Sequence, residues 1–244
     1  MKNKFNLPLN RLDFNDPEVK KNFNDKLFTE VAPKYNFITK ALSLGRDGAW
    51  KKMIIKRLPA LKNANCLDIA CGTGDISFLL AKKYKDGRIL GVDLNEDMLN
   101  VAKKKRVNNN IEFRQSDMNS LNINFDSIDI VTGGYALRNS PDLEKTLKGL
   151  YRIMKKGATA AFLDFSKPKN QLLQRLEYFI LKFWGGFWGL LAHGNPDVYG
   201  YIADSLKNYP DREAFKDLII KTGFKNIKRK LLYFGMLEII SFEK

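Results

Sequence analysis

The chain has 244 residues and a mass of 28.0 kDa, enough for one large globular domain or for one domain with a small cap. Hydrophobic residues make up 44% of it and aromatic residues 12%, too many for a chain that stays disordered. The formal net charge of +15 admits nucleic acid or an anionic membrane as a partner without naming either.

The cysteine content and the apolar stretches limit the compartment. Cys66 and Cys71 have neither the spacing of a disulfide framework nor that of a zinc site, so we expect a reducing compartment and no metal. The polar N-terminus has no apolar stretch of signal-peptide length. The most apolar stretch, residues 176–192, is interrupted by Glu177 and Lys182 and is too short to span a bilayer. We therefore predict a cytoplasmic protein without a transmembrane helix.

The chain divides into a helical segment and a longer α/β domain. Residues before Leu58 are expected to form helices, with Trp50 and Ile54 on one face. We assign residues 1–62 to an N-terminal helical segment that forms part of a substrate cap. In residues 63–244, short apolar runs alternate with helical periodicity, which indicates an α/β sheet with mostly parallel strands.

The strands and helices expected in this domain follow one another with short connections. Asn95 is placed as the N-cap of the helix after it. The last two strands are separated by a short turn at Gly235, so we expect them to pair antiparallel. Residues 167–211, dense in aromatic residues and glycine, look like a cap or lid inserted into the sheet domain. The predicted strands cover residues 66–70, 88–93, 111–116, 127–132, 158–164, 227–233 and 237–242, and the predicted helices cover 76–84, 96–106, 143–155 and 211–222.

A glycine turn after the first strand carries the first chemical signal. Gly72 and Gly74 remove side chains where a ligand must approach backbone N–H groups at the start of a helix. A dinucleotide fingerprint needs a third glycine at the position of Ser77, and a phosphate loop needs a Gly-Lys-Ser/Thr ending. Both are absent, so NAD, FAD and nucleoside triphosphates are disfavoured.

Carboxylates stand at the ends of the next strands. Asp93 ends the second strand, where it can accept both hydrogen bonds of a ribose diol. After the third strand, Asp117 can accept from an adenine amino group while the Met118 N–H donates to a ring nitrogen. With Asp68 on the first strand and no basic cluster for a pyrophosphate, this set indicates a nucleoside without phosphates. On this topology, with a terminal antiparallel hairpin, such a nucleoside points to S-adenosylmethionine. Read individually, these acids could instead be loop or capping residues.

Five separated segments share their pattern with a known family: FTEVAPKYN (28–36) with LSLG (42–45), LDIACGTGD (67–75), GYALRN (134–139), DFSKP (164–168) and YGYIADS (199–205). Over roughly residues 25–235, they make the chain resemble the ubiquinone/menaquinone biosynthesis C-methyltransferase family. The resemblance implies a class I, Rossmann-like methyltransferase. Its fold would be a seven-stranded, mostly parallel sheet with a C-terminal antiparallel strand, N-terminal helices and a helical lid insertion.

The resemblance also implies site residues and a cofactor. Thr73, Asp93 and the Asp117-Met118 pair would contact S-adenosylmethionine, and Gly134 stands where some members have a cofactor-contacting serine. Asp164 stands where the family commonly has the longer glutamate. The implied reaction is methyl transfer to a ring carbon of a polyprenylated quinol.

That reaction needs the ring carbon in line with the sulfonium methyl and an adjacent ring hydroxyl that is nearly ionised. Arg138 supplies a fixed positive fork for the phenolate, and Asn139 can donate a hydrogen bond to the same oxygen. Tyr35 could accept or relay the proton, as the resemblance also suggests. The alternatives are a structural ion pair for Arg138 and a simply buried hydroxyl for Tyr35. His193 has a suitable pKa range for a base but is better explained as a turn residue.

We therefore predict a methyltransferase that acts on demethylmenaquinol, slightly preferred, or on the corresponding benzoquinol of the ubiquinone pathway. The aromatic insertion would hold the apolar tail, unless it is an ordinary cap packed on the sheet. With the basic flanks, it suggests peripheral contact with an anionic membrane. A homodimer is allowed and nucleic acid is not expected as a partner. Three alternatives stay open: another small-molecule acceptor, RNA binding or methylation, and a non-catalytic cofactor-binding role in a quinone-synthesis complex.

Overall fold

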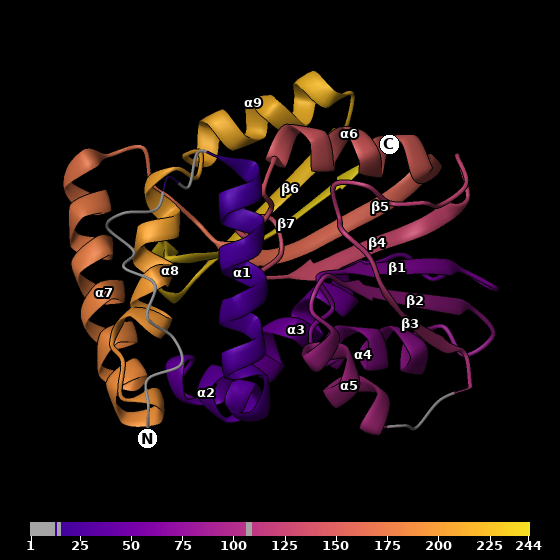
Figure 1. The fold of residues 1–244 in the computed structure, drawn as a ribbon. Helices are drawn as coiled ribbons and strands as arrows, with labels where there is room; N and C mark the ends of the chain where they lie inside the picture. Colours follow the sequence, from indigo (N-terminus) through magenta and orange to yellow (C-terminus); the bar gives the residue numbers. More distant parts are fainter. Residues whose placement is uncertain (1–12, 14–15, 106–108) are drawn as a thin grey trace.

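One sheet of seven strands carries the fold of the computed structural model, which describes residue 13 and residues 16–105 and 109–244 (Figure 1). The strand order is β3-β2-β1-β4-β5-β7-β6. Neighbouring strands from β3 to β5 pair in parallel, and β7 pairs antiparallel with both β5 and β6. This confirms the predicted class of sheet. The strands are β1 (Asn65–Ile69), β2 (Arg88–Asp93), β3 (Ile111–Gln115), β4 (Ile128–Gly134), β5 (Met154–Phe165), β6 (Lys225–Leu232) and β7 (Leu237–Glu243).

Helices cover both faces of the sheet, as expected for parallel strands joined by crossover connections. In Figure 1, α6 and α9 lie above the sheet and α3, α4 and α5 lie below it. Two buried hydrophobic clusters fill these layers, one centred on α6 and α9 and the other on α3 and α4. The helices are α1 (Pro17–Val31), η2 (Ala32–Lys34), α2 (Tyr35–Leu42), α3 (Asp47–Arg57), α4 (Asp75–Lys83), α5 (Glu96–Lys104), α6 (Leu143–Ile153), α7 (Gln171–His193), α8 (Asp197–Lys207), α9 (Arg212–Thr222) and η3 (Tyr233–Gly235).

The predicted N-terminal helices are present as α1, α2 and α3. Trp50 and Ile54 share the buried face of α3, as predicted. α1 lies between α8 and the sheet (Figure 1). The first residues of the 1–62 segment and the predicted helix end at 106 lie outside the described residues.

The start of α5 follows the predicted capping pattern. The Asn95 side-chain oxygen accepts a hydrogen bond from the Met98 N–H at 3.0 Å, and two acidic residues occupy the first turn. The other end of the Asn95 amide donates to Asp25 and Thr29 of α1. The same cap that begins α5 therefore also fixes α1 above the end of β2.

The helix predicted for residues 143–155 is wrong at its C-terminal end. α6 stops at Ile153, and Met154 is extended and pairs with Ile128 of β4. The register then shifts before Thr159, with Gly157 in the left-handed region. Met154 is apolar and fully buried, so in the sequence it extends the apolar pattern of α6. A short apolar run does not distinguish a buried helix from a buried strand.

The inserted segment folds into two packed helices, α7 and α8. A short connection reverses the chain after His193, with Gly194 in the left-handed conformation as the helix cap. Gly185 and Gly189 of α7 approach this connection and α8 closely. An added Cβ atom would lie 2.5 Å from the Tyr199 carbonyl oxygen at Gly185 and 2.6 Å from the Asn195 carbonyl oxygen at Gly189. α8 is largely buried, whereas α7 forms the outer edge of the molecule (Figure 1).

α7 has the most apolar sequence of the long helices, yet it is interrupted by charged residues. Among the described residues, no helix is both long enough and apolar enough to cross a membrane.

Candidate active site

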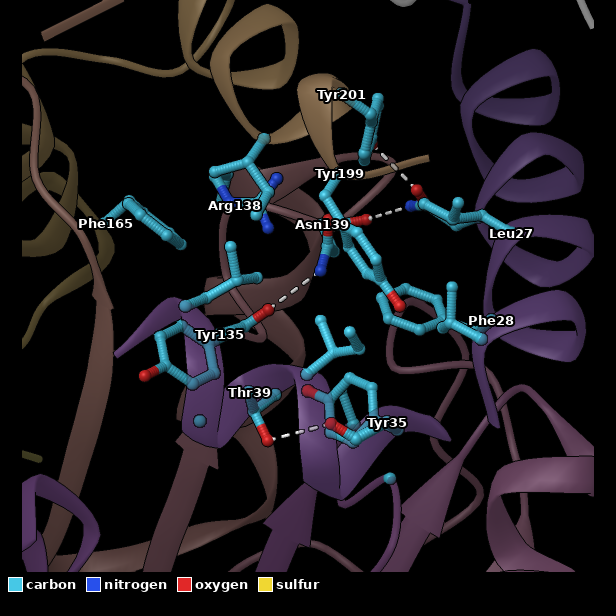
Figure 2. Close-up of a pocket in the computed structure, with 18 of the residues that line it drawn as sticks. Leu27, Phe28, Tyr35, Thr39, Tyr135, Arg138, Asn139, Phe165, Tyr199 and Tyr201 are labelled. Carbon is cyan, nitrogen blue, oxygen red and sulfur yellow. Dashed lines mark hydrogen bonds between the residues drawn. The ribbon is translucent and has the colours of Figure 1, made fainter. Parts of the chain in front are cut away.

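A cavity of about 500 Å³ opens at the carboxyl ends of β1, β2 and β4 and extends beneath α1, α2, α7 and α8. This is the edge where ligands bind in open α/β sheets, and the volume lies in the range of small-molecule sites. Figure 2 shows side chains from the helical cap and from the segment after β4 that surround the same space. The cavity wall is polar near the strand ends and mostly apolar beneath the helices.

The glycine turn after β1 forms one wall of the cavity. Ala70 and Gly72 both line it and both have positive φ angles, +46° and +53°. A Cβ atom on Gly72 would lie 3.0 Å from the Met98 methyl group. The turn therefore exposes backbone to the cavity at a place where a side chain has neither a relaxed conformation nor free space.

Asp93 lies beside this turn, at the end of β2. Its two oxygens accept hydrogen bonds from the Gly72 N–H at 2.7 Å and from the Asn95 N–H at 2.9 Å. Burial raises the pKa of Asp93 to about 6, against the lowering effect of these hydrogen bonds. Each oxygen keeps a further lone pair for a ligand hydroxyl.

Asp117 and Met118 also line the cavity, after β3. One oxygen of Asp117 accepts from the Asn119 N–H, and the other forms an ion pair of 2.9 Å with Lys21 of α1. This ion pair was not predicted, because Lys21 is 96 positions away in sequence and gives no local signal. Lys21 lines the cavity too, so α1 closes over the end where an adenine ring was expected.

Three predicted cofactor residues, Asp68, Thr73 and Gly74, are not among the described residues that line the cavity. The buried Asp68 carboxylate accepts from Ser77 at 2.7 Å and from Thr132 at 2.9 Å, which ties β1 to α4 and β4. Burial raises the pKa of Asp68 to about 6. These contacts place Asp68 beneath the turn, where it holds the turn in position.

The two turn residues after Gly72 also have supporting positions. The Thr73 hydroxyl donates to the Asn36 side chain at 2.8 Å and so joins the turn to α2. Gly74 adopts φ +81° at the N-cap of α4. Gly134, by contrast, does line the cavity, and a Cβ atom there would lie 2.9 Å from Ile76.

Arg138 lies in the segment after β4 and faces the cavity while almost fully buried. Its guanidinium donates to the Ser205 hydroxyl of α8, and its Nε lies 3.9 Å from an Asp164 oxygen. The rings of Phe165 and Tyr201 lie 5.2 and 5.8 Å from the guanidinium carbon (Figure 2). Arg138 therefore lines the cavity, and it also forms the ion pair that was the structural alternative.

Asp164 holds the backbone of this segment. One oxygen accepts from the Arg138 N–H at 3.0 Å and the other from the Phe165 N–H at 2.8 Å. Burial raises the pKa of Asp164, opposed by the nearby Arg138 guanidinium. The Arg138 Nε has no hydrogen-bond partner among the described residues and lies in ion-pair distance of the Asp164 carboxylate instead.

Asn139 follows Arg138 and lines the same cavity. Its amide nitrogen donates to the Tyr135 carbonyl at 2.9 Å, and its side-chain oxygen has no hydrogen-bond partner among the described residues. One of the two amide hydrogens is therefore engaged, whereas the side-chain oxygen is a free acceptor within the described chain. Most buried side-chain oxygens have a hydrogen-bond partner, so this oxygen is an acceptor that a ligand hydroxyl could satisfy.

Tyr35 begins α2 and lines the cavity (Figure 2). Burial raises the pKa of its hydroxyl to about 12, so the hydroxyl keeps its proton at neutral pH.

His193 lies at the end of α7, where its Nε2 is 3.0 Å from the Tyr199 hydroxyl and its Nδ1 is 3.5 Å from Glu30. It is not among the described residues that line the cavity.

Several residues of the cavity wall were not predicted from the sequence, among them Lys21, Asn24, Tyr135 and Phe165. Tyr135 was inside a family segment, and its φ of +59° marks strained backbone beside the cavity. Lys21 and Asn24 precede all the segments that carry the resemblance. Only packing of α1 against the sheet edge brings them to the site.

These residues fit S-adenosylmethionine. Gly72 leaves a space that a Cβ atom would fill, and two carboxylates at neighbouring strand ends offer acceptors for ribose hydroxyls and for an adenine amino group. A cluster of basic residues suited to a pyrophosphate is not seen among the described cavity residues. The cavity residues therefore match a nucleoside that carries no phosphate group.

Comparison with known proteins agrees with this geometry. The model of the ubiE/COQ5 methyltransferase family matches residues 16–241. The chain belongs to this family. A ubiquinone/menaquinone biosynthesis C-methyltransferase of Rickettsia bellii is 34% identical over 96% of this chain and 98% of its own length. A demethylmenaquinone methyltransferase of Lactobacillus johnsonii is 34% identical over 82% of this chain and 84% of its own length.

Solved structures agree on the fold. A SAM-dependent methyltransferase from Aquifex aeolicus aligns with a TM-score of 0.56 and 16% identity over 79% of this chain and 88% of its own. The Haemonchus contortus phosphoethanolamine N-methyltransferase 2, in complex with S-adenosyl-L-methionine, aligns with a TM-score of 0.62 and 16% identity over 80% of this chain and 52% of its own. The protein is thus an S-adenosylmethionine-dependent methyltransferase with the class I fold.

Proposed function

We propose that the protein methylates a ring carbon of a polyprenylated quinol, either demethylmenaquinol or the corresponding benzoquinol of the ubiquinone pathway. The observation that carries this proposal is a buried guanidinium, Arg138, in a cavity whose wall is otherwise largely apolar. Of the two relatives described above, one is named for ubiquinone/menaquinone biosynthesis and the other as a demethylmenaquinone methyltransferase. A charged group in such a site suits an acceptor that develops negative charge on one oxygen and is apolar elsewhere.

In this proposal the cofactor is held by the strand ends. Asp93 accepts hydrogen bonds from the two ribose hydroxyls, and Asp117 with the Met118 N–H binds the adenine edge. Gly72 and Gly134 present backbone at close range. Bound there, S-adenosylmethionine supplies an electrophilic methyl group. Asp68, Thr73 and Gly74 support these contacts from behind the turn.

Arg138 and Asn139 act on the quinol. The guanidinium stabilises the phenolate form of the ring hydroxyl, which raises electron density at the adjacent ring carbon. The free hydrogen of the Asn139 amide donates to the same oxygen. Because both side chains are buried, their charge and dipole are weakly screened.

Tyr35 serves as a hydrogen-bond donor or proton relay at the other side of the cavity. Its raised pKa means that the protonated hydroxyl dominates at neutral pH, so it cannot be the resting proton acceptor. The proton of the quinol must pass onward to solvent or to another group.

The helical cap receives the prenyl tail. The N-terminal segment 1–62 and the lid at about 167–211 both contribute apolar side chains to the cavity wall. Leu44, Ile180 and Phe183 line the cavity and are also exposed, so they mark its mouth. A tail of several isoprene units can leave the site between α2 and α7.

The outer face of α7 makes the contact with an anionic membrane in this proposal. Most large hydrophobic side chains that are exposed in the described chain lie on this helix, and the mouth of the cavity lies against it. The basic charge of the chain adds attraction to anionic lipids. The exposed apolar residues of α7 are Leu172, Leu173, Leu176, Phe179, Ile180, Phe183, Phe187, Leu190 and Leu191.

A methyl-transfer assay tests the reaction. Labelled S-adenosylmethionine is incubated with detergent-dispersed demethylmenaquinol, a short-tailed demethylated benzoquinol, an unprenylated phenol and bulk RNA in parallel. We expect carbon-linked label on a prenylated quinol and none on RNA. Equal labelling of the unprenylated phenol points to another small-molecule acceptor. Cofactor binding by calorimetry without any labelled quinol contradicts the proposed reaction.

A further inference from the structure

Asn24 of α1 connects three parts of the active site. Its Nδ2 donates to the Asn139 backbone carbonyl at 2.9 Å, and its Oδ1 accepts from the Tyr201 hydroxyl of α8 at 2.8 Å. Asn24 is only 6% exposed and lines the cavity. One amide group therefore satisfies two buried polar groups that come from positions 115 and 177 residues away.

Both groups that Asn24 binds are adjacent to Arg138. The Asn139 carbonyl belongs to the backbone directly after Arg138, and the Tyr201 ring lies against the Arg138 guanidinium. One turn earlier on the same face of α1, Lys20 donates to the Ser140 carbonyl at 2.5 Å. Two consecutive carbonyls of the segment that carries Arg138 and Asn139 are thus bound by α1.

We propose that Asn24 is a positioning residue for Arg138 and Asn139. This inference rests on the proposed quinol methylation, in which both side chains act on the ring oxygen. Asn24 fixes the backbone on one side of the guanidinium and the aromatic ring on the other. Because orientation of a charged group within a fraction of an ångström controls transition-state stabilisation, its loss lowers the rate while the cofactor contacts remain.

The test compares Asn24→Leu with Asn22→Leu. The first keeps similar volume but leaves the Asn139 carbonyl and the Tyr201 hydroxyl without this partner. Asn22 is the matched control, because it lies two positions earlier in α1 and is exposed. We expect kcat of Asn24→Leu to fall by about tenfold or more, with the quinol KM and the cofactor Kd within about twofold of the parent. Asn22→Leu should retain both constants.

The pH profile separates positioning from a general loss of stability. A poorly oriented guanidinium stabilises the phenolate less, so the pH midpoint of kcat should move upward by about one unit for a tenfold weaker effect. Among the described residues, the titratable groups that face Arg138 include Lys20 of α1, Asp164 of β5, Tyr201 of α8 and Tyr209 after it, and all four are retained in the variant. Unchanged kcat and an unchanged midpoint in Asn24→Leu would overturn the proposal.

Hydrogen exchange makes the result independent of the reaction. Amides of residues 137–140 should exchange faster in Asn24→Leu than in Asn22→Leu, whichever acceptor the enzyme uses. Faster exchange in an enzyme without quinol activity would reject the proposed function and keep the structural part of the inference. Unaltered exchange would reject the inference itself. If Asn24→Leu fails to fold, Tyr201→Phe removes only the hydroxyl and should shift kcat and the midpoint in the same direction.

Discussion

At the scale of single residues, the site is organised around buried charges that are partly satisfied by the protein. Asp93 has both oxygens bound to backbone N–H groups, and Arg138 is bound by Ser205 while its Nε has no hydrogen-bond partner in the part of the chain that the structure describes. Such groups are held rigidly and still have capacity for a ligand. This combination suits selective binding of a charged or polar ligand atom.

Arg138 is the residue whose loss should affect the chemical step most. We expect Arg138→Ala to lower kcat by roughly a hundredfold or more, by analogy with loss of an anion-stabilising donor. Arg138→Lys keeps the charge but lacks the planar fork, so its activity should be intermediate. Calorimetry should find the cofactor Kd of both variants within about threefold of the parent. Unchanged turnover in Arg138→Ala would falsify the assignment.

Asp93 should make cofactor binding depend on pH. Burial raises its pKa to about 6, whereas an unperturbed aspartate has a pKa of about 3.9. Below pH 6 the carboxyl takes up a proton and no longer accepts from both ribose hydroxyls. Calorimetry between pH 5 and 8 should therefore show a constant affinity above about pH 7 and a loss approaching tenfold per pH unit below 6.

Two variants identify the group responsible. Asp93→Asn should bind the cofactor weakly at all these pH values, because one acceptor is replaced by a donor. Asp68, the other aspartate with a pKa of about 6, lies beneath the turn, so Asp68→Asn should retain the pH dependence. A pH dependence that survives in Asp93→Asn and disappears in Asp68→Asn assigns the titration to Asp68 instead.

At the scale of elements, the lid depends on how closely its two helices approach. Gly185 and Gly189 allow the backbone of α7 to contact the segment from Asn195 to Tyr199. Gly186 lies between them in sequence, but a Cβ atom there would meet Pro196 at an ordinary distance of 3.6 Å. The three glycines therefore differ in packing although all are in the middle of the same helix.

Alanine substitutions should separate packing from helix propensity. Gly185→Ala should destabilise the protein by about 1–3 kcal/mol, because its Cβ atom would lie 2.5 Å from the Tyr199 carbonyl oxygen. Gly186→Ala is the matched control and should stabilise it by up to about 1 kcal/mol through helix propensity. Urea unfolding measures both. Equal changes in the two variants would show that α7 and α8 do not pack at the distance seen here.

At the scale of the whole molecule, apolar surface is distributed unevenly. The sheet and the helices on its two faces form buried clusters, whereas the outer helix α7 presents a row of large hydrophobic side chains. The mouth of the cavity borders this row at Ile180 and Phe183. The face that would dock on lipid and the path by which a lipid substrate would enter therefore lie on the same side.

Vesicle binding should depend on α7 and not on exposed aromatic residues in general. Phe179 of α7 and Phe125 of the segment before β4 are almost equally exposed, 68% and 67%. With vesicles of phosphatidylglycerol and phosphatidylcholine at low salt, Phe179→Ser should reduce co-sedimentation by about fivefold or more. Phe125→Ser should change it by less than about twofold.

The same variants test a dimer formed through α7. If a second copy covers this face, sedimentation velocity without vesicles should show a dimer that Phe179→Ser dissociates. No vesicle binding by the parent protein at low salt would contradict the proposed membrane contact. The methyl-transfer assay in detergent is independent of both results.

Local patterns along the chain were sufficient to predict the class of sheet, the glycine turn and the two carboxylates at strand ends, Asp93 and Asp117. These features depend on local periodicity and on the rule that parallel strands bring their carboxyl ends to one edge, so spacing along the chain is sufficient. The resemblance carried by segments such as 134–139 added Arg138 and Asn139 to the candidate site. The predicted helix end was wrong because an apolar residue such as Met154 can be buried equally well in a helix or in a strand.

Packing between distant segments determines which candidate residues reach the cavity and which groups hold them. Asp68 and Thr73 support the turn from behind, and Lys21 and Asn24 join the site from α1. These contacts link positions far apart in sequence, and they depend on how α1 and the lid pack on the sheet edge. The exposure of α7 is likewise a property of packing, because an apolar helix has the same sequence pattern whether its outer face is covered or exposed to solvent.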